Sequence, residues 1–298
     1  MNISPASVSL MQSQVLSSLM SSPSDTKSND SWASMFSLLV SSGSQFDQRP
    51  TDPISLLQSS SVKSLSATGR NMALFDPESA YKMMTVINKE DVSYKAQFSE
   101  LSQMESRIFQ MRDASQSLCG ISLSTGSDSV KSQLQDFVAQ YNNWIQRFNP
   151  DIQQGGLLAD TQAAQVSQYE LEQSIKNRFF GIKGGLHGLG DLGVTIDPNT
   201  RLASLDAAKL DSVLATNKPG VVDTVQEFST NFAKSASLLN SDGNFILNQL
   251  DNLGRVIHYI ADNKDSLQKE FGLGDAAKPT GQISQALAAY NQTYGHSG

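Results

Sequence analysis

The chain has 298 residues, a formal net charge of −7, 39% hydrophobic residues and 17% charged residues. The hydrophobic share lies below the roughly 45–50% that is typical of compact domains, which favours long helices and flexible segments over one dense globule. The acidic balance and the lack of a basic stripe argue against a nucleic-acid-binding protein.

No apolar run approaches the ~18 residues that a membrane-spanning helix needs. The first residues also lack the basic group that opens a cleavable signal peptide. We therefore expect a soluble protein without a membrane segment, exported, if at all, by a route that reads no cleavable signal.

The serine-rich segment, residues 1–75, differs in composition from the rest of the chain. It is rich in serine and has few charges, a composition typical of segments that cannot bury enough apolar surface to offset their ordering entropy, and we expect it to be largely disordered. Two short apolar clusters, Met11–Leu19 and Trp32–Leu39, have helical spacing. Either they become ordered against a partner or they pack loosely on their own body.

Residues 76–127 are predicted to form a long coiled-coil helix and a linker. Asp76 is a good N-cap, and Pro77 is suited to the first helical position. Gly120 and the Ser124–Ser127 stretch end the helix. Its apolar residues recur at steps of three, four or seven, which places them on one helix face; they are Ile87, Tyr94, Phe98, Leu101, Met104, Ile108, Met111 and Leu118.

Residues 128–243 are predicted to form a helical body with a β-hairpin. A helix capped by Ser127 or Asp128 runs to Asn149-Pro150, and a third helix, capped by Asp160, runs from Thr161 to Phe180. A glycine-rich loop follows. Alternating residues around a proline-containing turn between positions 192 and 205 then predict the hairpin.

Two more helices complete this body. Asp206 caps a short helix that extends to Leu214, and Pro219 ends the loop after it. A fourth substantial helix spans residues 222–239, and residues 240–243 form a turn.

Residues 244–298 are predicted to form the C-terminal coiled-coil helix and a tail. Gly272 and Gly274 end the helix, and Ile283–Tyr290 form a short terminal helix. The long helix carries a heptad stripe; its members are Ile246, Leu250, Leu253, Ile257, Ile260, Leu267 and Phe271.

The fold class that follows is mainly α, an elongated helical bundle or coiled coil with a small β-hairpin in the middle. Both long stripes need a cover, and the simplest arrangement packs residues 80–118 against residues 245–271, or against neighbouring copies. The candidate interface is therefore the set Tyr94, Phe98, Leu101, Ile108, Met111, Leu118, Ile246, Leu250, Leu253, Ile257, Ile260, Leu267 and Phe271.

No motif in the sequence predicts a catalytic, cofactor or metal site. The histidines at positions 187, 258 and 296 have no HxxxH spacing, and the single cysteine, Cys119, cannot form an intramolecular disulfide. Residues 188–193 match GxGxxG, but they follow a helix and lead into a hairpin, whereas dinucleotide binding needs the motif between a strand and a helix. A nucleotide-binding enzyme is therefore the least favoured function, and we expect no cofactor and no enzyme activity.

Residues 131–214 resemble the C-terminal domain of the bacterial flagellar filament-cap protein, hook-associated protein 2. Residues 88–118, with Tyr94–Gln97 and Leu101, are similar to the helix near that family's N-terminus. The pieces that carry the first resemblance are Phe137–Asn142, Gly156–Asp160, Leu192–Asp197, Leu205–Leu210 and Asn217–Pro219.

The resemblance implies a protein exported through the flagellar type III channel, whose helical legs assemble into a ring at the filament tip and assist flagellin folding. The implied partners are further copies of the chain, other flagellar axial proteins or flagellin, and possibly an export chaperone; neither nucleic acid nor membrane is implied. The implied location is the extracellular flagellum.

The sequence departs from the family pattern in three places. Large head domains separate the two similar regions in that family, whereas only residues 120–129 separate them here. The family's opening motif is absent, and the last helix breaks at residues 272–274 where the family's helix continues. We therefore expect a headless cap-like or axial component; the alternative is a cytoplasmic binding or regulatory module of the export system.

Overall fold

The computed structural model describes residues 65–180 and 184–295. The two apolar clusters of the serine-rich segment and His296 lie outside the described residues. Within them the chain forms seven helices and one two-stranded antiparallel sheet, so the predicted mainly α fold with a small hairpin is confirmed.

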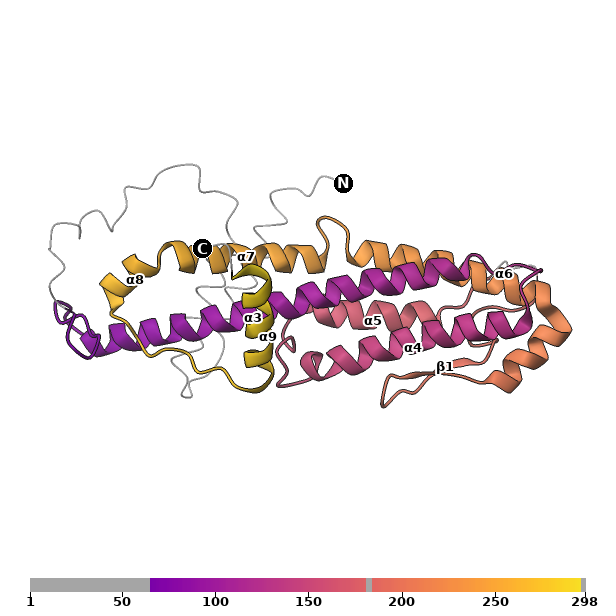
Figure 1. Cartoon of the computed structure of the whole chain (residues 1–298), viewed down its shortest axis with the longest axis horizontal. Coiled ribbons are helices and arrows are strands. Elements are labelled where there is room, and N and C mark those ends of the chain that lie inside the picture. Colours follow the sequence, from indigo (N-terminus) through magenta and orange to yellow (C-terminus); the bar gives the residue numbers. More distant parts are fainter. Residues whose placement is uncertain (1–64, 181–183, 296–298) are drawn as a thin grey trace, which may run out of the picture. The chain divides into compact units, whose positions relative to one another are not determined.

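The long helix α3 (Pro77–Leu118) begins as predicted (Figure 1). The Asp76 carboxylate accepts a hydrogen bond from the Ser79 amide at 3.0 Å, and Pro77 occupies the first turn, where its missing N–H costs nothing. Helices from both the middle and the end of the sequence pack along α3, most extensively α6, α9 and α7.

Helix α4 (Ser127–Ile152) differs from the prediction at both ends. Its N-cap is Gly126, without a side-chain cap, because the chain already turns through Ser122–Thr125 before the helix. At its other end it passes Pro150, since a proline in the last turn removes only one hydrogen bond.

Helix α5 (Gln162–Lys176) begins one residue later than predicted and ends four residues earlier. Thr161, not Asp160, is the N-cap, and its hydroxyl donates to the Leu158 carbonyl. The helix stops because Asn177 adopts an extended conformation (ψ 141°) and the Phe179 amide then bonds the His187 carbonyl at 2.6 Å.

The predicted hairpin consists of β1 (Val194–Ile196) and β2 (Ala203–Leu205), with Thr195 opposite Ser204. Asn142 of α4 fixes the position of β2, because its amide accepts from the Ala203 N–H at 2.7 Å and donates to the Ala203 carbonyl at 2.8 Å. The hairpin is therefore attached to the helical layer beneath it.

Helix α6 (Ala207–Leu239) replaces the two separate helices that the sequence predicted. The Asp206 cap is confirmed, because its carboxylate accepts from the Lys209 amide at 3.0 Å. The expected loop is a kink at Asn217 (φ −148°, ψ 55°), whose side chain accepts from the Gly220 amide and so caps the second half. Pro219 lies in the first turn of that half, where proline is tolerated.

The predicted single C-terminal helix is divided into α7 (Phe245–Asp262) and α8 (Lys264–Phe271). The break is at Asn263, whose side chain donates to the Tyr259 carbonyl and competes with the helical pattern. The terminal helix α9 (Gly281–Tyr294) is longer than predicted and crosses α3 (Figure 1).

Burial divides the described structure into two regions that share α3 and α7. The body, residues 101–253, contains one continuous buried cluster from Leu101 to Leu253, centred on edge-to-face contacts of Phe137 with Phe228 and Phe232. The arm, residues 65–98 and 254–294, has a thinner interior outside that cluster; its buried apolar residues are Met84, Ile87, Ala96, Val256, Ile257, Ile260 and Ala286.

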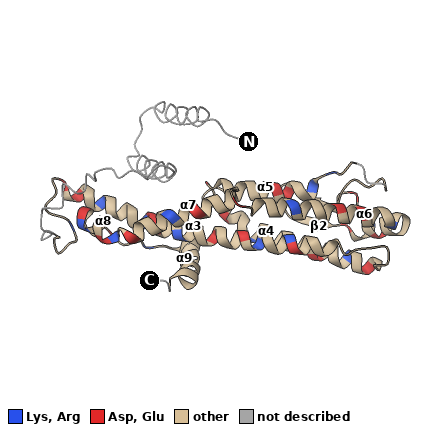
Figure 2. Cartoon of the chain, turned by 90° about the horizontal axis from the view of Figure 1, so that it is seen from above, with Lys and Arg blue, Asp and Glu red and all other residues tan. Residues whose placement is uncertain are grey.

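Charges of both signs alternate along the helices (Figure 2). Among the described residues, no helix combines the length and the apolar character that crossing a bilayer requires.

Candidate assembly surface

The structure covers most of the predicted interface stripe within a single chain. The buried members are Leu101, Ile108, Met111, Leu118, Ile246, Leu250, Leu253, Ile257 and Ile260. The partly buried members are Tyr94, Phe98, Leu267 and Phe271. Helices α7 and α8 both pack on α3, and a Cβ added to Gly254 would lie 3.7 Å from the Phe98 ring. Helix α3 therefore packs against α7 and α8 of the same chain, while contact between copies through these residues stays a prediction.

An aromatic cluster joins α9 to α3 in the arm. The Phe98 ring makes edge-to-face contacts with Tyr290 and Tyr294, at centroid distances of 5.9 Å and 5.3 Å. The two tyrosines are four residues apart on α9 and lie 5.1 Å from each other. Neither tyrosine was among the predicted interface residues, although their spacing places both on one helix face.

Polar side chains lie within the arm beside this cluster. Asp91 and Lys95, one helical turn apart, form an ion pair at 2.6 Å. Burial raises the pKa of Tyr94 to about 12 and also raises the pKa of Glu90. The interior of the arm is thus a mixture of apolar and polar groups.

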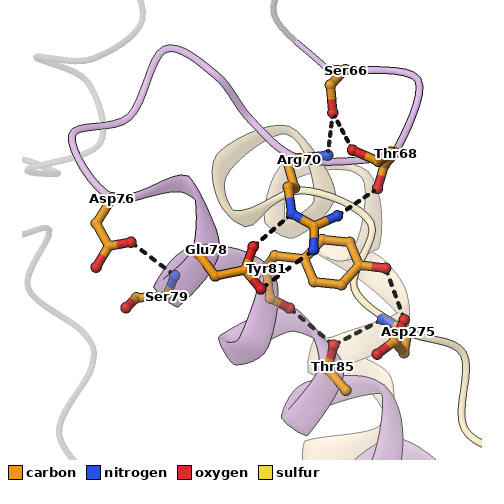
Figure 3. Close-up of polar contacts among 9 residues, drawn as sticks. All are labelled: Ser66, Thr68, Arg70, Asp76, Glu78, Ser79, Tyr81, Thr85 and Asp275. Atoms are coloured by element: carbon orange, nitrogen blue, oxygen red, sulfur yellow. Dashed lines mark hydrogen bonds and ion pairs between the residues drawn. The ribbon is translucent and has the colours of Figure 1, made fainter.

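We call the end of the arm the clasp: residues 66–71, the first three turns of α3, and residues 269–275 (Figure 3). Arg70 Nε donates to the Glu78 carboxylate at 2.7 Å, and the guanidinium carbon lies 4.3 Å from the centroid of the Tyr81 ring. The Tyr81 hydroxyl donates to the Asp275 carboxylate at 2.9 Å. Residues that are about 200 positions apart in the sequence are thereby connected.

Side-chain amides and hydroxyls hold the backbone of the clasp. Asn88 Nδ2 donates to the carbonyls of Leu273 and Asp275 at 3.1 Å and 3.0 Å, and the Asp275 amide donates to Thr85 Oγ1 at 2.8 Å. Asn71 Nδ2 donates to the Lys269 carbonyl at 2.9 Å. The sequence analysis assigned residues 65–75 to the serine-rich segment; in the structure they pack against the end of α8.

The glycines after α8 allow this close approach. Gly272 (φ 90°) and Gly274 (φ 62°) have positive φ values, which glycine adopts without strain. A Cβ at these positions would lie 2.5 Å from the Gly69 carbonyl oxygen and from the Thr85 amide nitrogen, respectively. Both were predicted as helix terminators, and the structure shows that they also admit neighbouring backbone.

A charged cluster lies where the arm meets the body. Arg147 of α4 donates to Glu100 at 2.6 Å, to Gln103 at 3.1 Å and to Asp151 at 3.1 Å. Burial raises the pKa of both carboxyl groups, although Arg147 opposes that shift. The guanidinium of Arg147 is thus the cation that compensates the charge of both buried carboxylates.

His187 with the glycine-rich loop, His258 and Cys119 belong to different parts of the described structure. His187 Nδ1 is 3.2 Å from the Phe179 carbonyl, and His258 is exposed on α7. Residues 188–193 lead into β1, as the sequence predicted, and Cys119 Sγ lies 3.0 Å from Ser229 Oγ. Over residues 65–180 and 184–295, no three His, Cys, Asp or Glu side chains are grouped so that they could hold a metal ion.

Comparison with known proteins matched a family model and several solved structures. The family described as flagellar hook-associated protein 2 C-terminus matches residues 108–273. The crystal structure of the flagellar cap protein FliD D1-D2-D3 domains from Escherichia coli is 21% identical, with a TM-score of 0.39. That likeness covers 43% of this chain, which spans 37% of the other. No curated protein matches. The family match covers more than half of the 298 residues and confirms the resemblance, so this chain belongs to the flagellar hook-associated protein 2 C-terminal family.

Proposed function

We propose that this protein is a structural, non-enzymatic component of the bacterial flagellum, a cap-like or axial protein that is exported from the cell. The observation that carries the proposal is the family match over residues 108–273, which includes most of the body and reaches the clasp.

The proposed protein has no head between α3 and α4. Residues 119–126 form the whole connection between these helices, and they pack on the body. Ile121 is fully buried, and its carbonyl accepts from Gln226 Nε2 at 2.7 Å. A connection this short and this firmly packed supports a cap-like protein reduced to its helical part.

Copies of the chain associate through the end of the arm in this proposal. Met72, Phe75 and Leu273 belong to the clasp and its flank; Phe75 is fully exposed, and the other two are 61% and 45% exposed. Exposed apolar side chains gathered in one place favour a protein–protein contact. Other flagellar axial proteins or flagellin are the further partners.

The location is tested by separating sheared filaments, culture supernatant and cytosol, and probing each fraction for the chain. We expect the protein in the filament fraction, with a cytosolic enzyme as the marker for lysis. A chain found in the cytosol alone would contradict the flagellar structural role.

The surface is tested by Phe75→Ser, with Leu123→Ser as the control, because Leu123 is likewise a large exposed apolar residue (61%) but lies in the body linker. Light scattering over a concentration series should show oligomers for the parent and for Leu123→Ser. It should show a lower mass for Phe75→Ser. Equal masses for the two variants would exclude this surface.

A second candidate is a cytoplasmic binding or regulatory module of the export system, with an export chaperone among its partners. It is favoured by the coverage of the α3 and α7 stripes within one chain, since such a chain needs no second copy to bury them. Retention in the cytosol together with a constant monomer mass would support this module.

An enzyme that uses residues 188–193 is tested by titrating NAD or ATP, where a ligand at 100 times its Kd should add about 2.7 kcal/mol to the free energy of unfolding.

A further inference from the structure

We propose that α9 is an exchangeable element, and that the α3 surface beneath it also accepts α9 from a second copy of the chain. This inference rests on the self-association in the proposed function but concerns a different surface. It depends on three features of the arm: what α9 contacts, how the chain reaches it, and where that connection is fixed.

Helix α9 depends on α3 for its packing. Its main contacts are with α3, and Ala286 is the buried residue that it contributes. Its aromatic contacts with α3 are those of Tyr290 and Tyr294 with the Phe98 ring. Because every copy carries the same helix and the same α3 surface, α9 of a second copy would make identical contacts.

The connection to α9 is drawn out along α3 (Figure 1). Residues 272–280 contain no helix or strand, and residues 276–280 make no hydrogen bond within the described structure. Five extended residues span at most about 18 Å. An extended connection has little slack, and short hinge segments make exchange of an element between copies easier.

The two ends of this connection differ in rigidity. At its start, Asn88, Thr85 and Tyr81 hold residues 273–275 on α3 by four hydrogen bonds. At its end, Gly281 has φ 58°, and a Cβ there would meet nothing within 4 Å. The start is therefore fixed while the base of α9 is an open hinge, so α9 can swing to a neighbouring copy without disturbing the clasp.

Effective concentration decides between the two arrangements. A short tether holds α9 near its own α3 at an effective concentration of about millimolar. A dilute chain therefore keeps its own α9, whereas copies held side by side in an assembly reach comparable local concentrations. Exchange of α9 would then join neighbouring subunits.

The test shortens the connection by deleting Ala276 and Ala277, which withdraws about 7 Å of extended chain. We expect this variant to form a dimer by light scattering at concentrations where the parent has a lower mass. Adding Tyr290→Ala and Tyr294→Ala to the deletion should restore the mass of the parent. An unchanged mass after the deletion, or a dimer that survives the loss of both tyrosines, would overturn the exchange.

Two controls separate this inference from the proposed function. Circular dichroism should show unchanged helix content apart from α9, because the deletion lies outside every helix. One outcome is that the parent self-associates, loses this self-association in Phe75→Ser, and keeps it in a variant that lacks residues 281–298. In that case the exchange of α9 is wrong while the proposed function stands. If the chain is absent from filaments yet the shortened variant forms a tyrosine-dependent dimer, the proposed function fails while the exchange stands.

Discussion

The body and the arm share one helix, α3, but bury it differently. Within the body, the stripe residues of α3 from Leu101 to Leu118 are at most 1% exposed. Within the arm, Met84, Ile87 and Ala96 are buried, while the tyrosine and phenylalanine at positions 94 and 98 are partly exposed. The same spacing of apolar residues therefore gives two levels of burial, and the difference lies in what covers each half.

The cover in the body has several layers, whereas the cover in the arm is thin. Helices α4 and α6 pack on the body section of α3 and contribute large aromatic side chains, and α5 and the hairpin form a further layer on these helices. The arm section is covered by α7, α8 and α9, and hydrogen bonds of the clasp fix its end. Apolar burial should therefore dominate the stability of the body, and local polar contacts that of the arm.

The largest expected effect is the loss of a buried ring in the body. Phe137→Ala should lower the free energy of unfolding by about 4 kcal/mol, because Phe137 is 1% exposed and a cavity remains. The matched variant in the arm, Phe98→Ala, should cost about 1–2 kcal/mol, since its ring is partly exposed. Urea denaturation measures both, and equal costs would contradict the division into body and arm.

The next largest effect concerns the charged cluster where the two regions meet. Arg147→Met leaves Glu100 and Asp151 buried without their cation, and should cost about 3 kcal/mol, the lower end for a broken buried pair because Arg147 is 34% exposed. Arg112→Met is the control, since its partner Asp113 is 63% exposed; it should change stability by less than about 1 kcal/mol. Similar costs for the two variants would show that the cluster is not effectively buried.

The long helix and the hairpin could be predicted from local signals. Asp76-Pro77 marked the start of α3, and the alternation around Asp197–Thr200 marked the turn between β1 and β2. Helix ends that depend on contacts beyond the helix were missed: α5 stops where the Phe179 amide bonds the His187 carbonyl, and the spacing of apolar residues does not encode that contact.

The site was predicted in part for the same reason. The stripes on α3 and α7 follow from spacing within one helix, so their residues could be named. The clasp joins Asn71 and Tyr81 to residues 269–275, and the aromatic cluster joins Phe98 to α9. Polar and aromatic pairs so far apart in the sequence leave no periodic signal, although Gly272 and Gly274 did mark the place where the chain turns.

A smaller, local effect is expected in the clasp. Gly274→Ala adds a Cβ 2.5 Å from the Thr85 amide nitrogen at φ 62°, so the clasp must open. Gly243→Ala is the matched control, because it shares a positive φ (76°) but has open space around the added Cβ. Gly274→Ala should cost about 2 kcal/mol and the control about 1 kcal/mol.

Hydrogen exchange of the Asp275 amide, which donates to Thr85 Oγ1, reports on the clasp directly. Its protection should fall in Gly274→Ala and stay unchanged in Gly243→Ala, while amides of the body keep their protection in both. Faster exchange throughout the body in Gly274→Ala would show that arm and body unfold as one unit.

The smallest expected effect is a difference in pH dependence between the two regions. Burial raises the pKa of Glu100, so its folded form holds a proton more tightly than its unfolded form. The stability from this group is present below about pH 4 and is lost as the pH rises through the folded pKa. Glu100→Gln should therefore change the free energy of unfolding most between pH 4 and neutrality. In that range the free energy of unfolding should decline less steeply with pH in the variant than in the parent.

In the arm, the hydrogen bond from Arg70 lowers the pKa of Glu78, so that group contributes stability above about pH 4, and this contribution is lost as the pH falls. Glu78→Gln should accordingly show the opposite sign in urea denaturation from pH 3 to pH 7, and the same sign for both variants would mean that burial does not distinguish these two carboxyl groups.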